Sequence, residues 1–232
     1  MPDARRRARD VGVVLPAGGA GTRLGARVPK QFLAVGGVPI LALTARHFAR
    51  HPAVAEIVVA APAALIARTE RLLRRYVPRA PITVVPGGRE RQASVAEGLR
   101  ALSARCRVVI VHDAVRPFIT RGLIDGVVSA ARGTGAAICA LPIAETVKRV
   151  RDGLVDTTID RAGLWSVQTP QAFRADVLRE AHDKARRDAV LGTDDAMLVE
   201  RLGHAVRVVP GIVGNVKVTT PDDLRRARRA SR

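Results

Sequence analysis

The chain has 232 residues, of which 47% are hydrophobic and only 3% aromatic, and it carries a formal net charge of +18. This share of apolar residues suits a packed core built from Val, Leu, Ile and Ala, and it excludes a disordered chain. No apolar run approaches the ~18–20 residues that are needed to cross a bilayer. We therefore expect a globular protein with no membrane partner.

The positive charge is spread along the whole chain rather than concentrated in one segment. Of the 39 basic residues, 35 are Arg. Few aromatic residues are available to stack on single-stranded nucleic acid. We therefore expect anionic small molecules, and no nucleic acid, as partners. A basic RNA-binding protein that has kept the fold without catalysis is the alternative from another class.

Cysteine usage indicates a reducing compartment. Cys106 and Cys139 form neither a disulfide framework nor a CxxC metal motif, and both lie within or beside apolar runs. We interpret them as core thiols. The basic N-terminal segment is not followed by the uncharged stretch of a secretory signal. These features predict a cytoplasmic protein.

A glycine-rich segment, LPAGGAGTRLGARVPKQF at 15–32, follows an apolar run that we interpret as a first strand. Glycines allow backbone N–H groups to approach a ligand closely, and Arg23 and Lys30 follow the turn. Clustered N–H groups and two cations suit a polyphosphate. The spacing is not that of a Walker A loop, and Leu24 stands where a dinucleotide fingerprint has its third glycine. We predict a nucleoside triphosphate loop; for the glycines alone, a plain strand-to-loop turn is the alternative.

Short apolar runs alternate with helical patterns along the chain. This predicts an α/β fold with a Rossmann-like, mainly parallel sheet and helices on both faces. After the first strand we expect strands at 57–61, 82–85, 108–111, 136–141 and 206–209, and helices at 39–50, 63–76, 124–132 and 175–187. A further helix is expected after the second glycine turn, 86–91. The run 108–111 is the most apolar and is predicted to be the central strand.

Polar residues at the ends of these runs are candidates for a site. Asp113 follows the predicted central strand, and ligands of open α/β sheets bind at the carboxyl ends of strands. A buried Asp needs a cation, metal or hydroxyl partner, and Arg116 lies three residues further on. His112 is interpreted as a packed residue. Lys217, in the strand-like run 214–219, is expected to reach into the site.

A hairpin is predicted within residues 142–160. Alternating apolar and polar residues flank Asp152-Gly153, which is a typical hairpin turn. Such a hairpin is either an edge strand pair or an arm that pairs with another subunit. We expect a polar loop at 164–171, and a helix with Thr193 as its N-cap. The chain is otherwise interpreted as one domain over 1–232.

Seven motifs, taken in order, resemble the 2-C-methyl-D-erythritol 4-phosphate cytidylyltransferase family of the non-mevalonate isoprenoid pathway. They are LPAGGAGTRLG with PKQF, GGRERQASV, VHDAVRPF, ETVKR, DRAGLWSVQTPQAF, GTDDAMLVE and NVKVTTPDDL. The resemblance implies transfer of CMP from CTP to 2-C-methyl-D-erythritol 4-phosphate, with release of pyrophosphate. It also implies Mg²⁺ held mainly by the triphosphate, with no protein metal site, and a homodimer joined by the hairpin. A ribitol 5-phosphate cytidylyltransferase is the alternative.

The resemblance also implies roles for individual residues. Arg23 and Lys30 would be catalytic and stabilise the transition state. The implied nucleotide-binding residues are Ala17, Gly18, Gly19, Gly21, Gly88, Arg89, Ser94 and Ala114, with the role of Arg89 open. The implied acceptor-binding residues are Asp113, Arg116, Thr146, Arg161, Thr169, Thr193 and Lys217. The resemblance further implies that the hairpin swaps across a homodimer, so Thr146 and Arg161, which lie on or beside it, are expected to serve the neighbouring subunit's site.

Overall fold

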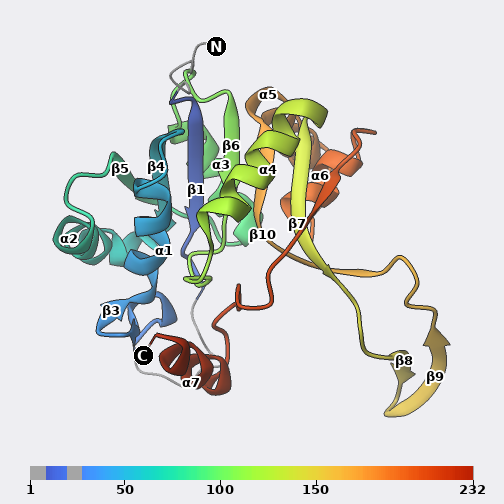
Figure 1. The fold of residues 1–232 in the computed structure, drawn as a ribbon. Helices are drawn as coiled ribbons and strands as arrows, with labels where there is room; N and C mark the ends of the chain where they lie inside the picture. The colour runs from blue at the N-terminus through green and yellow to red at the C-terminus, as the bar shows by residue number, and fades with distance from the viewer. Residues whose placement is uncertain (1–8, 20–27, 232) are drawn as a thin grey trace, which may run out of the picture.

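A seven-stranded sheet with the order β11-β7-β10-β6-β1-β4-β5 forms the centre of the molecule (Figure 1). The computed structural model describes residues 9–19 and 28–231. The strands of this sheet are β1 (Val11–Pro16), β4 (Val54–Ala61), β5 (Ile82–Pro86), β6 (Val108–Val111), β7 (Ala136–Pro142), β10 (Trp165–Arg174) and β11 (Arg207–Pro210). β10 pairs antiparallel with β6 and β7, and the other four pairs are parallel. The predicted mainly parallel sheet, with 108–111 at its centre, is confirmed.

Helices cover both faces of this sheet, as predicted. The helices within the described residues are α1 (Ile40–Ala49), α2 (Ile66–Tyr76), α3 (Arg91–Ala101), α4 (Arg121–Thr134), α5 (Ala175–Arg187), α6 (Asp195–Glu200) and α7 (Pro221–Ala230), with 3-10 turns η2 (Lys30–Phe32) and η3 (Ala63–Leu65). Of these, α7 lies outside the central sheet and packs against Val35 and Val218. The buried side chains of α1, α2 and α4 pack on one face, and those of α3, α5 and α6 on the other. α4 begins before the predicted residue 124 because Thr120 caps it, accepting a hydrogen bond from the backbone N–H of Leu123.

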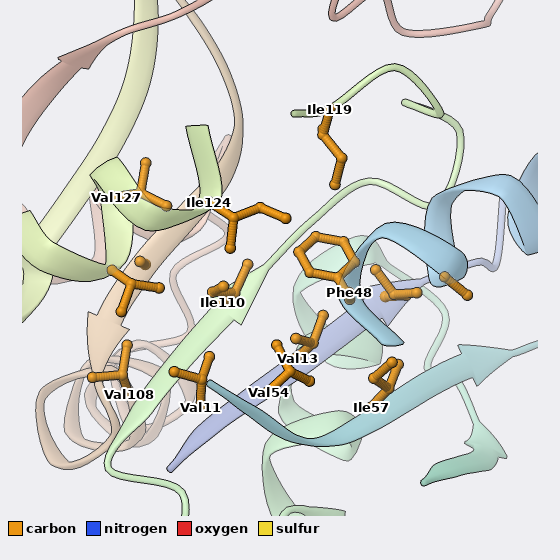
Figure 2. Close-up of a cluster of buried hydrophobic side chains, with 14 of the residues drawn as sticks. Val11, Val13, Phe48, Val54, Ile57, Val108, Ile110, Ile119, Ile124 and Val127 are labelled. Atoms are coloured by element: carbon orange, nitrogen blue, oxygen red, sulfur yellow. The ribbon is translucent and has the colours of Figure 1, made fainter. Parts of the chain in front are cut away.

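The core is built from aliphatic side chains of the inner strands. Figure 2 shows Phe48 of α1 beside Val13 of β1 and Ile110 of β6. All three side chains are fully buried, and each such burial stabilises the fold by about 1.5–3 kcal/mol. Because helices pack on both faces of β1 and β6, the carboxyl ends of these two strands are held in place.

The segment 164–171, expected as a polar loop, is instead most of strand β10. Its polar residues Gln168, Thr169 and Gln171 are buried. They find partners in distant segments: the Gln168 amide donates to the Ile212 carbonyl at 3.1 Å, and the Gln171 amide donates to Asp194 at 2.8 Å. The sequence interpretation was wrong because those partners lie far away along the chain.

Two short hairpins stand outside the central sheet: β2 (Ala34–Val35) with β3 (Val38–Pro39), and β8 (Val147–Arg151) with β9 (Leu154–Ile159). The β8–β9 pair is the predicted hairpin, turned by Asp152 and Gly153 at φ of 51° and 80°, which suits a two-residue turn with positive φ at both positions. Figure 1 shows this arm extending away from the body. Its contact with a second subunit stays a prediction.

The segment 214–219 pairs with no strand of the described structure, so the expected strand-like run is corrected to a loop. The backbone N–H of Val218 donates to the Val115 carbonyl at 2.9 Å and ties this loop to the one that follows β6. α7 begins directly after it with a capping box between Thr220 and Asp223.

The two cysteines are buried free thiols, as predicted. Burial raises the pKa of the Cys139 thiol to about 12, so this group stays protonated and unreactive at neutral pH. None of the helices in the described part of the chain is long and apolar enough to cross a membrane.

Candidate active site

A cavity of about 340 Å³ opens where β1 and β6 end, at the edge of the sheet where ligands of open α/β folds bind. It brings together the loop after β1, the turn after β5, the start of α3 and the loop after β6. The described residues that line it are Pro16, Ala17, Gly18, Gly19, Lys30, Gln31, Gly88, Arg89, Glu90, Arg91, Ser94, Asp113, Ala114, Val115 and Lys217. Ten of the predicted site residues are therefore neighbours in one cavity.

The residue that directly follows β1 is held by a buried glutamine. Gln31, which is 2% exposed, donates its side-chain N–H to the Ala17 carbonyl at 2.9 Å. A Cβ atom placed on Gly19 would lie 3.1 Å from Lys30 Cε, so the lysine side chain runs close against the glycine backbone. Gln31 belongs to the PKQF motif, but no role was predicted for it. Gly21 and Arg23 lie outside the described residues.

The turn after β5 depends on small residues. A Cβ atom on Gly88 would lie 2.3 Å from the Cβ of Ala93, so this turn cannot carry a side chain there without moving. The hydroxyl of Ser94 donates to the carbonyls of Gly88 and Glu90, at 3.3 Å and 3.1 Å. Gly88 and Ser94 thus shape one wall of the cavity, with the exposed Arg89 at its edge.

Asp113 is the centre of a cluster of charges. Its Oδ2 lies 2.9 Å from Lys217 Nζ and 3.5 Å from Arg116 Nε, and its Oδ1 lies 3.3 Å from Arg91 Nε. Burial raises the pKa of the Asp113 carboxyl, but the charges of Lys217 and Arg91 outweigh burial, so the pKa lies well below its ordinary value. Asp113 is therefore a fixed anion among three cations.

Thr169 and His112 hold the backbone of this cluster. The Thr169 hydroxyl accepts the Asp113 backbone N–H at 3.0 Å and lies 3.1 Å from His112 Nδ1. The other ring nitrogen of His112 lies 3.0 Å from the Arg116 carbonyl, which can only accept. Burial lowers the pKa of His112 to about 4. His112 is therefore neutral and fully buried, which confirms its interpretation as a packed residue.

Asn215, which sequence reasoning missed, connects two parts of the site. It is fully buried, and its side-chain N–H donates to the Thr169 carbonyl at 2.7 Å. Its backbone carbonyl accepts from Arg116 Nη1 at 2.7 Å. Asn215 therefore holds the loop that carries Lys217 against β10 and Arg116.

Three predicted acceptor residues belong neither to the lining of the cavity nor to the cluster around Asp113. Thr146 and Arg161 are exposed at the base of the arm, where Arg161 donates to the Ala144 carbonyl. Thr193 is exposed before α6, and the prediction that it caps this helix was wrong. The cap is Asp194, whose carboxylate accepts from the Met197 N–H at 2.9 Å.

Sequence reasoning also missed Arg91 and Asp195. Arg91 lines the cavity, and its Nη1 lies 2.7 Å from Asp195 Oδ2. Burial raises the pKa of Asp195, but Arg91 outweighs burial and the pKa is lowered overall. The sequence offered one signal for these residues: Arg91 lies in the GGRERQASV motif and Asp195 in the GTDDAMLVE motif. A single arginine is otherwise not conspicuous among 35.

The fold and the cavity together define a nucleotidyltransferase of the α/β class. The model of the IspD family, 2-C-methyl-D-erythritol 4-phosphate cytidylyltransferase, matches residues 11–230. The enzyme of that name from Symbiobacterium thermophilum is 47% identical over 218 residues, covering 94% of this chain and 91% of its own. The one from Geobacter metallireducens is 46% identical over 215 residues, covering 91% and 93%.

Solved structures agree with the sequence relatives. The crystal structure of 2-C-methyl-D-erythritol 4-phosphate cytidylyltransferase from Thermus thermophilus superposes with a TM-score of 0.80 at 37% identity, covering 96% of this chain and 98% of its own. The chain belongs to the 2-C-methyl-D-erythritol 4-phosphate cytidylyltransferase family. It is a CTP-dependent cytidylyltransferase, and the resemblance stated from the seven motifs is confirmed.

Proposed function

We propose that CTP and 2-C-methyl-D-erythritol 4-phosphate meet in this cavity, where the acceptor phosphate attacks the α-phosphorus of CTP in line and pyrophosphate leaves. The observation that carries this proposal is that Lys30, Gly18, Gly88 and Ser94 share one cavity with the Asp113–Lys217 pair. The attacking phosphate oxygen is already anionic, so the reaction needs positioning and charge stabilisation rather than a strong base.

We assign the two ends of the cavity to the two substrates. The glycine loops would bind the nucleotide through backbone N–H groups, and Lys30 would stabilise the charge that grows at the α-phosphorus. Asp113 would accept hydrogen bonds from acceptor hydroxyls. Lys217 lines the cavity and its side chain is 40% exposed, so it can turn toward the acceptor phosphate while Arg91 and Arg116 stay on Asp113.

Isothermal titration and steady-state kinetics test this division. Asp113→Asn should raise the KM for the acceptor and leave the Kd of Mg²⁺–CTP within about twofold, since it keeps the side-chain shape and removes one charge-assisted contact. Gly88→Ala should weaken CTP binding and spare the acceptor. The opposite pattern, with Asp113→Asn weakening CTP binding alone, would contradict the assignment.

We propose that Mg²⁺ enters with CTP and is held mainly by triphosphate oxygens. Within residues 9–19 and 28–231, no group of three or more His, Cys, Asp or Glu side chains is placed to hold a metal ion, and Asp113 already contacts three cations. When bound, the ion would offset phosphate charge. Chelation with EDTA should abolish pyrophosphate release and added Mg²⁺ restore it; turnover in excess EDTA would contradict this proposal.

We propose that the arm of one subunit completes the site of another in a homodimer. Thr146 and Arg161 lie at the base of the arm, which extends away from the body (Figure 1). Val155 and Leu154 on β9 are 64% and 75% exposed, which suits an interface better than solvent. Such an exchange would bring Arg161 to the partner's acceptor pocket.

Coexpression of two defective variants tests the exchanged arm. If arms exchange, a dimer of Lys30→Ala with Arg161→Ala contains one intact site and one doubly defective site. Random pairing then gives about a quarter of the wild-type rate per subunit, measured at low acceptor concentration. If each subunit uses its own arm, every site carries one defect and no activity is regained.

We propose that the enzyme works in the cytoplasm. The buried free thiols of Cys106 and Cys139 support a reducing compartment. Cell fractionation followed by immunoblotting checks this: the protein should be recovered with cytoplasmic markers, and recovery in the envelope fraction would contradict it.

A further inference from the structure

Two buried side chains, Asp195 and His182, extend the cluster of charges around Asp113 through Arg91. Asp195, in the first turn of α6, and His182 of α5 lie outside the set of residues that line the cavity. Asp195 is 1% exposed, so its charge requires partners. Its Oδ2 lies 2.7 Å from Arg91 Nη1 and its Oδ1 lies 3.0 Å from His182 Nε2. Both oxygens of Asp195 are thus engaged.

This arrangement fixes the direction in which Arg91 faces Asp113. One end of the guanidinium contacts Asp195, and its Nε lies 3.3 Å from Asp113 Oδ1. A guanidinium presents its donors in a rigid planar fork, so holding one end determines the position of the other. Lys217 approaches Oδ2 instead. The carboxylate of Asp113 is therefore oriented from two sides.

A second contact joins the same two elements. Gln92, next to Arg91, accepts a hydrogen bond from the Gly192 N–H at 2.8 Å and donates to the Val190 carbonyl at 3.1 Å. The loop held this way leads into α6 and carries Thr193. Two contacts therefore join the start of α3 to the region where α6 begins. One runs from the Gln92 side chain to the backbone of the loop before α6, and the other is the ion pair between Arg91 and Asp195.

We propose that Arg91 and Asp195 are positioning residues for the acceptor: Asp195, held by His182, fixes Arg91, and Arg91 fixes the Asp113 carboxylate. The proposal rests on the proposed function, in which Asp113 contacts the acceptor. Neither residue needs to touch the reacting phosphates. Replacing either residue should therefore raise the KM for the acceptor more than it lowers kcat, and should leave the KM for CTP almost unchanged.

Steady-state kinetics of Asp195→Asn and Arg91→Lys test this. Asp195→Asn should raise the acceptor KM about 10-fold, less than the ~10²-fold that a misplaced reacting group can cost. Arg91→Lys keeps the charge but cannot bridge two carboxylates, so it should raise the acceptor KM by a similar factor. In the double variant the two effects should not multiply, because both variants break the same bridge. Arg100→Lys, on an exposed part of α3, is the matched control.

The outcomes are distinguishable from failure of the proposed function. A wild-type acceptor KM in Arg91→Lys, together with a raised acceptor KM in Asp113→Asn, would overturn the positioning role alone. Acceptor binding would then need only a positive charge at position 91, and not a guanidinium that contacts two carboxylates. An unchanged acceptor KM in Asp113→Asn would overturn the acceptor role of Asp113 and this inference with it. Thermal unfolding of each variant shows whether the fold is kept, and Arg91→Lys gives the decisive result if Asp195→Asn unfolds.

Discussion

Replacing Asp113 by Asn removes one negative charge from among three cations without changing the size of the side chain. Breaking a buried ion pair from one side costs about 3–5 kcal/mol. Two of the partners here, Arg91 and Lys217, keep 30% and 40% of their side-chain surface exposed, so water compensates part of the loss. We therefore expect the free energy of unfolding at neutral pH to fall by about 2–3 kcal/mol, which lies below most of that range because solvent screens the exposed partners.

The pH dependence of this loss identifies its cause. Because the pKa of Asp113 is lowered in the folded protein, the carboxylate stabilises the fold above its unfolded pKa of about 3.9 and loses this contribution as the pH falls below that value. The gap between wild type and Asp113→Asn should therefore be complete at about pH 7 and shrink below about pH 4.

Urea unfolding of both proteins across this pH range measures the gap. Asp183→Asn is a control, because Asp183 is 62% exposed and lies 3.8 Å from Arg186, and such surface pairs contribute about 0–1 kcal/mol. Equal stability of Asp113→Asn and wild type at neutral pH, or a gap that widens on acidification, would refute the view of Asp113 as a fixed anion.

Other predictions concern the nucleotide end and the arm. Lys30→Ala should lower kcat at least ~10²-fold, the scale of losing one charge-stabilising donor, whereas the control Lys184→Ala should keep the wild-type kcat. A near-normal kcat in Lys30→Ala would show that Lys30 takes no part in the chemical step. Gly88→Ala should raise the KM for CTP about 10-fold, since the added Cβ would lie 2.3 Å from the Cβ of Ala93 and such overpacking costs about 1–3 kcal/mol. The control Gly122→Ala should behave as wild type, because the space around Gly122 is open. Arg161→Ala should mainly raise the acceptor KM, and a change in the CTP constant alone would contradict its placement.

The edge of the sheet that carries the site was predictable because local signals mark it. Apolar runs at 11–15 and 108–111 read as buried strands, and the residues that follow them, a glycine loop and Asp113, are unusual at such places. Parallel strands bring their carboxyl ends to one edge. The cavity found there contains residues of both loops, so the position of the site follows from strand order and loop chemistry.

The supporting residues were not predictable because their partners are remote. Arg91 and Asp195 are 104 residues apart, and Asn215 lies 46 residues from Thr169. Strand β10 was read as a polar loop for the same reason, since burial of Gln168 and Gln171 depends on donors and acceptors that only the folded chain supplies. A polar side chain with a distant partner looks like a solvated one in a single sequence.

The most direct test of the account is pyrophosphate release from CTP and Mg²⁺, with 2-C-methyl-D-erythritol 4-phosphate and ribitol 5-phosphate offered in parallel. We predict turnover with the methylerythritol phosphate and none with ribitol phosphate, and loss of this turnover in Lys30→Ala. Turnover with ribitol phosphate alone would contradict the acceptor assignment while keeping the CTP site, and no pyrophosphate with either acceptor would contradict the proposed function itself.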